Sequence, residues 1–395
     1  RRQRQMCIRD RYNIMLKHFF RKLLSTRING VYISNHKKEL IRFCESAGVT
    51  LSKRGGETDF INKWKPIYAN VNVDFYRFYA NFCGEDANIL SDDIYHTVVE
   101  PILNDQAALT VYGNKNMYEL LMNRDIFPIC ILRNIDGDFM DRDYHVISMN
   151  EDEFAKRITS NERVKKLKKF ICKPTTDTSG GNGVHLYRLR DDGRWINDEG
   201  QELSLAHLTK VYKKDFILQE CVNPSAFVKQ FNETSFSTLR IFTYRSVKDD
   251  AIHFIGGYLR VGAKGSFKDN VWGGGYACPI KADGTLAKFA TDSQRKRYDN
   301  INGISLTENT FEIPNFDKVM ELVTYVAKKN VPNRLLSFDI ILDEANIPHV
   351  IEFNIKNQTV TTVQTSGKTF FGEFTDEVID YCKIRRDKIK YSMIL

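Results

Sequence analysis

The stretch SFDIILDEANIPHVIEFNIKN, residues 337–357, sets acidic and amide side chains within two apolar runs. Two such runs joined by a short polar segment predict a β-hairpin. Residues two apart on a strand share a face, so Glu352 and Asn354 should project together, and Asp339 can lie opposite them on the neighbouring strand. We therefore expect three oxygen ligands to converge on one face of this hairpin.

These three side chains suit a magnesium ion, which favours carboxylate and amide oxygens together with substrate phosphates. A surface hairpin with solvated acids is the alternative. It is disfavoured because the acids are embedded among apolar residues such as Phe338, Ile340 and Phe353, where an unpaired charge would be costly. The predicted ligands of Mg²⁺, or of Mn²⁺ in its place, are Asp339, Glu352 and Asn354.

A glycine-rich loop lies nearer the N-terminus, in KPTTDTSGGNGVHLY, residues 173–187. Its glycines allow backbone N–H groups to approach anionic oxygens, and the lysine that opens it supplies a point charge for phosphates. The stretch is no Walker A motif, because no GK[ST] follows and the next element is a strand. A purely structural hairpin is the alternative. The predicted phosphate-binding residues are Lys173, Gly180, Gly181 and Gly183.

Two further segments supply candidates for binding a base and a phosphoryl group. The predicted strand FILQECV, residues 216–222, contains Gln219 and Glu220 near its end, where a donor and an acceptor can meet the edge of an adenine. Arg240 in STLRIFT and Arg260 in YLRVG lie in predicted strands. Either guanidinium could reach a phosphate or an acyl phosphate, and a salt bridge within the sheet is the alternative.

Composition and charge limit the class of protein. A chain of 395 residues, 42% hydrophobic and 27% charged, is typical of a globular protein with two or three substructures around one cleft, and no apolar run is long enough for a transmembrane segment. Half of the net charge of +8 comes from residues 1–11, which we expect to be a non-native or disordered tail. The remainder is only mildly basic, so no nucleic-acid partner is expected.

The eight cysteines include no CxxC pair and most lie in apolar surroundings, which fits reduced thiols in a cytoplasmic protein. Residues 12–110 are predicted to be mostly helical, with aromatic residues such as Tyr76 and Phe78 packed in a core. Strands and helices alternate from residue 111, which predicts an α+β fold. A last helix is expected over residues 373–388.

The order of these motifs resembles the ATP-grasp superfamily. KP with a glycine-rich loop, Q-E, S-x-x-L-R, L-R-x-G, and then D with E-x-N follow one another as they do there. The sequence is most similar to the sugar-transfer associated ATP-grasp family, found with bacterial surface-polysaccharide genes. That family also shows a helical lead-in, ILSDD-like and ILND-like stretches as in residues 89–93 and 102–105, and a lysine that opens a helix, here Lys115. The likeness covers about residues 76–382.

The resemblance implies an ATP-grasp fold, in which a lid subdomain over residues 111–215 and a C-terminal subdomain over residues 216–395 enclose ATP. It also implies ligation of a small-molecule or glycan-linked carboxylate to an amine through an acyl phosphate, in the modification of surface polysaccharide or cell-envelope precursors. Its implied site residues are Lys115 and Lys173 on the phosphates, Gln219, Glu220 and Val222 around the adenine, Arg240 as the phosphate-stabilising cation, and Asp339, Glu352 and Asn354 on magnesium.

Two departures from the superfamily pattern bear on substrate binding. No acid follows the predicted adenine strand before Glu233, so the ribose contact is unassigned. Lys356 follows E-x-N where other branches have Gly or Pro, and it is a candidate for facing the acceptor.

Three alternative functions stay open. An ATP-grasp kinase would use the same nucleotide site, with His185 or Asp269 as a general base. A sugar-nucleotide transferase would use Asp136 and Asp138 as a DxD metal site, although an exposed acidic turn explains that tract better. A non-catalytic nucleotide-binding module is disfavoured by the joint presence of Lys173, Arg240, Asp339, Glu352 and Asn354.

Overall fold

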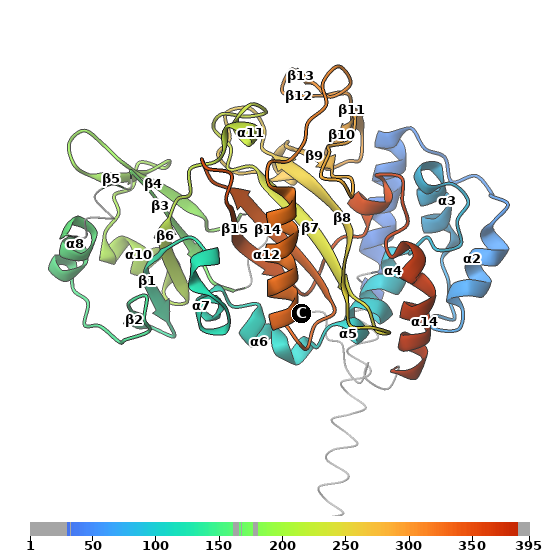
Figure 1. Cartoon of the computed structure of the whole chain (residues 1–395), viewed down its shortest axis with the longest axis horizontal. Coiled ribbons are helices and arrows are strands. Elements are labelled where there is room, and N and C mark those ends of the chain that lie inside the picture. The colour runs from blue at the N-terminus through green and yellow to red at the C-terminus, as the bar shows by residue number, and fades with distance from the viewer. Residues whose placement is uncertain (1–29, 32, 161–165, 167, 177–180, 386–395) are drawn as a thin grey trace, which may run out of the picture.

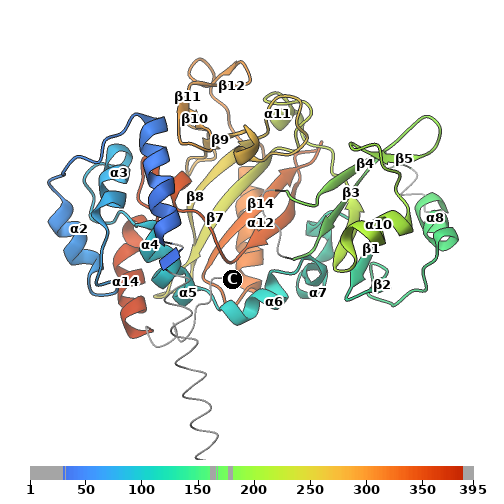
Figure 2. The same cartoon turned by 180° about the vertical axis from the view of Figure 1, so that it is seen from behind.

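The computed structural model describes residues 30–31, 33–160, 166, 168–176 and 181–385. A helical region, a seven-stranded sheet and a six-stranded sheet follow one another along the long axis (Figure 1), and the view from behind shows the same order (Figure 2). The predicted α+β class and the helical N-terminal region are confirmed. The tail over residues 1–11 and Gly180 lie outside the described residues.

The six-stranded sheet is antiparallel throughout, in the order β2-β1-β6-β3-β4-β5. Phe154 of α8 and Leu208 of α10 are buried with apolar residues of this sheet in one core. The bounds are β1 Cys130–Ile135, β2 Asp138–Met140, α8 Glu151–Ser160, β3 Lys169–Pro174, β4 His185–Leu189, β5 Trp195–Asn197, α10 Leu205–Tyr212 and β6 Phe216–Glu220.

Strand β6 hydrogen-bonds to β1 on one side and to β3 on the other. The predicted boundary between residues 215 and 216 therefore does not coincide with the division between the two sheets, which falls after Glu220. The reason is topological: β6 comes last in sequence but inserts between strands that precede it, and sequence order alone cannot reveal this.

The seven-stranded sheet has the order β11-β10-β9-β8-β7-β14-β15. Helix α12 lies across it (Figure 1) and buries Val319, Val323 and Val326 against it, and every residue of β14 is buried. The bounds are α11 Ala226–Lys229, β7 Thr238–Arg245, β8 Ile252–Val261, η5 Val271–Gly273, β9 Tyr276–Pro279, β10 Ala290–Thr291, β11 Arg297–Tyr298, β12 Asn300–Ile301, β13 Ile304–Ser305, α12 Phe316–Lys329, β14 Leu335–Leu342 and β15 Pro348–Asn354.

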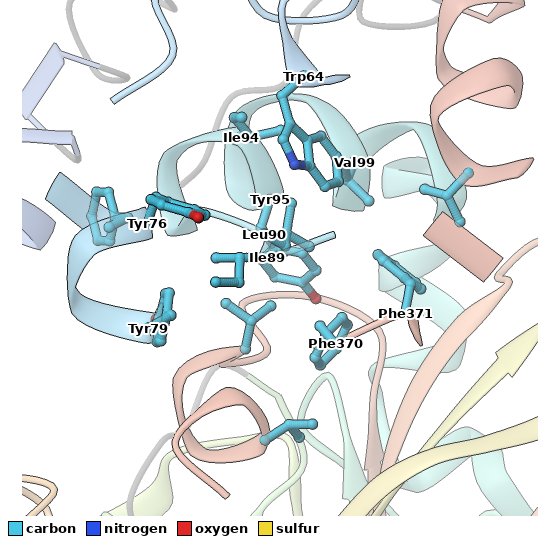
Figure 3. Close-up of a cluster of buried hydrophobic side chains, with 14 of the residues drawn as sticks. Trp64, Tyr76, Tyr79, Ile89, Leu90, Ile94, Tyr95, Val99, Phe370 and Phe371 are labelled. Atoms are coloured by element: carbon cyan, nitrogen blue, oxygen red, sulfur yellow. The ribbon is translucent and has the colours of Figure 1, made fainter. Parts of the chain in front are cut away.

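The helical region joins residues from both ends of the chain. Residues 33–47 are helical, and Trp64, Tyr76, Tyr95, Phe370 and Phe371 converge in one cluster (Figure 3). The predicted core role of the aromatic residues is thereby confirmed. The bounds are α2 Glu57–Trp64, α3 Val73–Cys83, α4 Asp92–Ile94, η1 Tyr95–Val99, α5 Glu100–Leu103, α13 Thr361–Gln364, η6 Gly372–Phe374 and α14 Thr375–Ile384.

The last helix, α14, begins two residues later than predicted, and the predicted end at residue 388 lies outside the described residues. Short elements connect the helical region to the first sheet: η2 Gln106–Ala108, α6 Leu109–Tyr112, η3 Lys115–Met117, α7 Tyr118–Leu121 and η4 Arg124–Ile126. Within the described part of the chain, no helix has the length and apolar character needed to cross a bilayer. Seven of the cysteines are described and all of them are free thiols.

Asn104, in the ILND stretch, ties the helical region to the seven-stranded sheet. Its Nδ2 donates to the carbonyl oxygens of Leu335 and Ile355, both at 2.7 Å, and its Oδ1 accepts from the N–H groups of Arg334 and Leu335. The side chain is 1% exposed. It therefore fixes both the start of β14 and the segment directly after β15.

We expect Asn104→Ala to destabilise the protein by roughly 3 kcal/mol, because it leaves buried carbonyl and N–H groups without partners. Thermal and urea unfolding of the purified variant measures this. Asn309→Ala is the control, since Asn309 is exposed and its change should cost no more than about 0.5 kcal/mol. Equal stability of the two variants would contradict the anchoring role.

Candidate active site

Three charged side chains lie in a row across adjacent strands of the seven-stranded sheet. Asp339 of β14 pairs in register with Arg240 of β7 on one side and with Glu352 of β15 on the other. Arg240 donates two hydrogen bonds to Asp339, one from Nε to Oδ1 and one of 2.8 Å from Nη2 to Oδ2. The predicted hairpin is confirmed, and its two acids are direct cross-strand neighbours.

Arg260 of β8, which pairs in register with Thr238 of β7, is a second arginine in contact with Asp339. Its Nη1 donates to Asp339 Oδ2 at 3.0 Å, and its Nη2 lies 3.0 Å from Asp269 Oδ1. The other oxygen of Asp269 accepts from the hydroxyl of Thr238. Burial, only partly offset by the charge of Arg260, raises the pKa of Asp269. Two arginines thus share one carboxylate, and both also line a cavity.

Two lysines face the far end of the row. Lys115 Nζ lies 3.1 Å from Glu352 Oε2, and Lys173 Nζ donates to the carbonyl oxygen of Ile351 at 3.2 Å. The register of β14 and β15 shifts between Asp339 and Ile340, a bulge that leaves Ile351 outside the ladder pairs. The bulge thereby turns a backbone carbonyl toward the lysine.

The charges of these groups depend on one another. Burial raises the pKa of Glu352, but the positive charges of Lys115 and Lys173 outweigh it and hold this pKa well below its usual range. Burial and the nearby charge of Lys115 lower the pKa of Lys173 to about 8. Glu352 is therefore ionised at neutral pH, whereas Lys173 can lose its proton in mildly alkaline solution.

We expect nucleotide affinity to fall above pH 8. A phosphate binds better to the protonated form of Lys173, and below pH 8 this lysine is already protonated. Above pH 8 the free protein has lost this proton, so nucleotide binding must take one up. The affinity should then fall by up to about tenfold per pH unit. Calorimetric titration of Mg·ADP at pH 8.5, in buffers of different ionisation enthalpy, measures that uptake. Lys173→Met should bind Mg·ADP weakly and without proton uptake. Unchanged proton uptake in this variant would show that another group takes up the proton.

The end of β6 forms the opposite wall of the cavity, lined by Gln219, Glu220, Cys221 and Val222. Gln219 Nε2 donates to Pro128 O at 3.2 Å, and Glu220 Oε1 accepts from the N–H of Ile129 at 2.9 Å. These side chains therefore hold the segment directly before β1 against the end of β6. Among the described residues, none accepts a hydrogen bond from the N–H of Val222, which leaves that donor available to a ligand.

The glycine-rich loop is described from Gly181 onward, so the predicted role of Gly180 lies outside the described residues. Gly183 has φ 71°, and a Cβ there would lie 3.0 Å from Pro174, which requires glycine at this turn. Gly181 lines the cavity, and its carbonyl oxygen accepts from Lys268 Nζ at 2.9 Å. Lys268 was missed by the sequence analysis, although it directly precedes Asp269 in a loop with many glycines.

A second, larger cavity of about 1000 Å³ adjoins the first. Lys356, predicted as a candidate for the acceptor side, lines it, and so does Asn354. Glu352 and Asn354 thus line the same cavity, as their spacing of two predicts. The two cavities share a wall made of Lys115, Arg240, Arg260, Asn270 and Glu352.

The donor set fits a magnesium ion that is also bound by substrate phosphates. The predicted ligands supply two neighbouring carboxylates and one amide, and magnesium in phosphate-transfer sites commonly uses one or two carboxylates. Within the described residues, no cluster of three or more His, Cys, Asp and Glu side chains could hold a metal without such help. Asp339 is also bound by two arginines, so the assignment of the three ligands stays a prediction.

The other candidates occupy separate places. Asp136 lies in the β1–β2 turn, where it is exposed and pairs with Lys214, as an acidic surface turn would. His185 is among the lining residues of neither cavity, and burial lowers its pKa. Glu233 is exposed and lines neither cavity, so it is not placed to contact a ribose in either of them.

Comparison with known proteins places the chain among nucleotide-using enzymes. The model of the family described as sugar-transfer associated ATP-grasp matches residues 98–376, well over half of the chain. No curated protein matches the chain significantly.

Three solved structures illustrate the likeness in fold. An ADP complex of N5-carboxyaminoimidazole ribonucleotide synthetase is 9% identical, with 64% of this chain and 46% of that chain covered and a TM-score of 0.36. D-alanine–D-alanine ligase from Bacillus anthracis is 11% identical, with 73% of this chain and 71% of that chain covered and a TM-score of 0.38. The ATP-grasp ligase PsnB with minimal precursor, Mg and ADP is 12% identical, with 71% of this chain and 62% of that chain covered and a TM-score of 0.37. The chain thus spans about half the length of the synthetase, and the family match alone carries the assignment.

Proposed function

This chain belongs to the sugar-transfer associated ATP-grasp family, and on that premise we propose that it is an ATP- and magnesium-dependent ligase that joins a carboxylate to an amine. Members of the ATP-grasp family typically use ATP with Mg²⁺. The carboxylate would be a small molecule or glycan-linked, and the family description supports a role in the modification of surface polysaccharide or cell-envelope precursors.

The observation that carries this proposal is the wall shared by the two cavities. The smaller cavity offers the Val222 N–H at one end and buried Lys173 at the other, a layout that suits a nucleotide. The larger cavity has room for a second substrate, and Arg240 and Arg260 face both. A phosphoryl group bound at this wall would therefore be accessible from the substrate side.

The groups that would hold the ion and the phosphates follow from the contacts. Asp339, Glu352 and Asn354 would bind magnesium, and Lys115 and Lys173 would bind phosphate oxygens. The ion, when bound, would neutralise phosphate charge and keep the nucleotide in line. Arg240 keeps its charge, because Asp339 outweighs the effect of burial and raises the pKa of this guanidinium.

The proposed reaction has two steps. A carboxylate oxygen attacks the γ phosphorus of ATP, the bond to the β–γ bridging oxygen breaks, and ADP leaves. An amine then attacks the acyl carbon, phosphate departs with the former carboxylate oxygen, and the amine loses a proton to solvent or to a nearby base. Arg240 and Arg260 would stabilise the charge that spreads over the transferring group, and the buried cavity would position both partners.

A kinase acting on a hydroxyl remains the alternative, with Asp269 as its base. Both oxygens of Asp269 are engaged, one by Arg260 and one by Thr238, so a substrate hydroxyl would have to displace one of these contacts before this carboxylate could accept its proton. The two functions differ in product: a ligase releases free phosphate, whereas a kinase leaves it on the acceptor.

Calorimetric titration of the full chain with Mg·ATP is the first test, and binding is expected. Incubation with ATP, a panel of carboxylic acids and hydroxylamine follows, because hydroxylamine traps an acyl phosphate as a hydroxamate. Hydroxamate formation that depends on the acid supports the ligase. A phosphorylated acceptor without hydroxamate would favour the kinase, and a folded protein that fails to bind Mg·ATP would refute both.

A further inference from the structure

A buried arginine lines the larger cavity away from the row of charged strand residues. Arg295 lies in the turn between β10 and β11, has a left-handed φ of 67°, and is 5% exposed. It contributes to the cavity wall together with Tyr258, Ala277 and Thr362. The smaller, nucleotide-side cavity does not include it among its lining residues.

The guanidinium of Arg295 has few partners. Its carbon lies 5.1 Å from the centre of the Phe43 ring, and its buried Nε has no hydrogen-bond acceptor. Among the described residues, none forms a side-chain hydrogen bond or an ion pair with it. A buried arginine without a carboxylate partner is costly, so such a residue usually has a ligand or a partner that supplies negative charge.

The nearest acids do not form an ion pair with the guanidinium of Arg295. Asp92 and Glu39 act on Arg295 only through space, while burial lowers the pKa of this guanidinium. The carboxylate of Asp92 already accepts from Tyr79 and from Thr361, and that of Glu39 pairs with His36. The unmatched positive charge therefore faces the cavity.

We propose that Arg295 binds an anionic group of the substrate in the larger cavity, a carboxylate or phosphate separate from the group that reacts at the shared wall. The guanidinium presents a planar fork that suits such oxygens. The substrate would then be an acid with two anionic centres, one reacting near Arg240 and Glu352 and one held at Arg295. This inference rests on the proposed function for the assignment of the larger cavity to substrate.

The test uses small anions as probes on the full chain. The nucleotide site is first saturated with Mg·AMPPNP, and glutarate, sulfate and the neutral isostere glutaramide are then titrated by calorimetry. We expect the wild type to bind glutarate about tenfold or more tightly than glutaramide, because a charged hydrogen bond is lost in the latter. Sulfate binding comparable to that of glutarate would indicate a tetrahedral, phosphate-like group, and a preference for glutarate would indicate a carboxylate.

Two variants and one control locate the anion. Arg295→Gln should weaken the binding of the preferred anion about tenfold or more, and Arg295→Lys should restore part of it. Arg297→Gln is the matched control, since Arg297 belongs to the same hairpin, stacks on Phe82 and Phe289, and lines neither cavity. It should bind anions as the wild type does.

The outcomes separate this inference from the proposed function. If Mg·AMPPNP does not bind, the proposed function fails, and the anion titration is repeated without nucleotide. If neither glutarate nor sulfate binds the wild type, or if Arg295→Gln binds them unchanged, Arg295 holds no anion and the inference is overturned. Should Arg295→Gln fold poorly, the comparison of glutarate with glutaramide in the wild type, together with Arg295→Lys, decides the matter.

Discussion

Glu352→Gln should lower ATP-dependent turnover about a thousandfold while the protein stays folded. The change is isosteric, but it removes the charge that pairs with Lys115 and the carboxylate proposed to bind magnesium. It leaves three lysines and two arginines in the cavity with one fewer acid among them. Losses of this size are typical when a preorganised charged group at a reacting centre is removed.

Steady-state phosphate release at several magnesium concentrations measures the effect. The required magnesium concentration should rise together with the loss of rate, because a metal ligand has been weakened. Glu344→Gln is the matched control, since Glu344 lies in the exposed turn of the same hairpin and is not among the residues that line either cavity. If the turnover of Glu352→Gln were close to that of the control, Glu352 would not be a ligand of the metal.

Arg240→Gln should reduce both activity and stability. Arg240 supplies two of the three arginine hydrogen bonds that Asp339 accepts, and the side chains of Arg240 and Asp339 are 17% and 5% exposed. Breaking a buried ion pair from one side costs about 3 to 5 kcal/mol when the remaining charge is uncompensated, and Arg260 should keep the loss near the lower figure. The rate should fall about a hundredfold or more, because a cation at the transferring phosphoryl group is missing.

The comparison with Arg245→Gln separates these two effects. Arg245 belongs to the same strand and is also buried, but it contacts Val331 and Asp250 and lines neither cavity. Its change should lower the melting temperature without lowering turnover per folded molecule. If both variants kept full turnover, Arg240 would have only the role of a structural ion pair.

The fold could be predicted because its signals are local. Apolar runs bounded by polar segments indicated β7, β8, β14 and β15, and the spacing of Glu352 and Asn354 by two placed them on one face. The aromatic residues of α3 are core residues, as their helical spacing indicates. None of these conclusions depends on contacts between distant segments.

Other features needed the tertiary structure. Strand β6 follows α10 in sequence yet lies between β1 and β3, so the predicted boundary at residue 215 cuts through a sheet. Gln219 and Glu220, predicted around adenine, use their side chains to hold Pro128 and Ile129. Tyr258 could have been found from its spacing of two from Arg260, whereas the turn that carries Arg295 offered no such periodic signal.

The sequence by itself determined the family, the order of the strands along the chain and the types of residue available for binding phosphate and metal. These follow from residue chemistry and from the period of each element, which act over a few neighbours. Only the tertiary structure decided which charged groups lie next to one another. Two arginines share Asp339, and Lys173 is buried beside Lys115. Arg295 lines a cavity without an ion pair to an acid among the described residues. Burial and charge pairing depend on segments far apart in sequence, because the electrostatic energy of a group is set by everything that surrounds it in space.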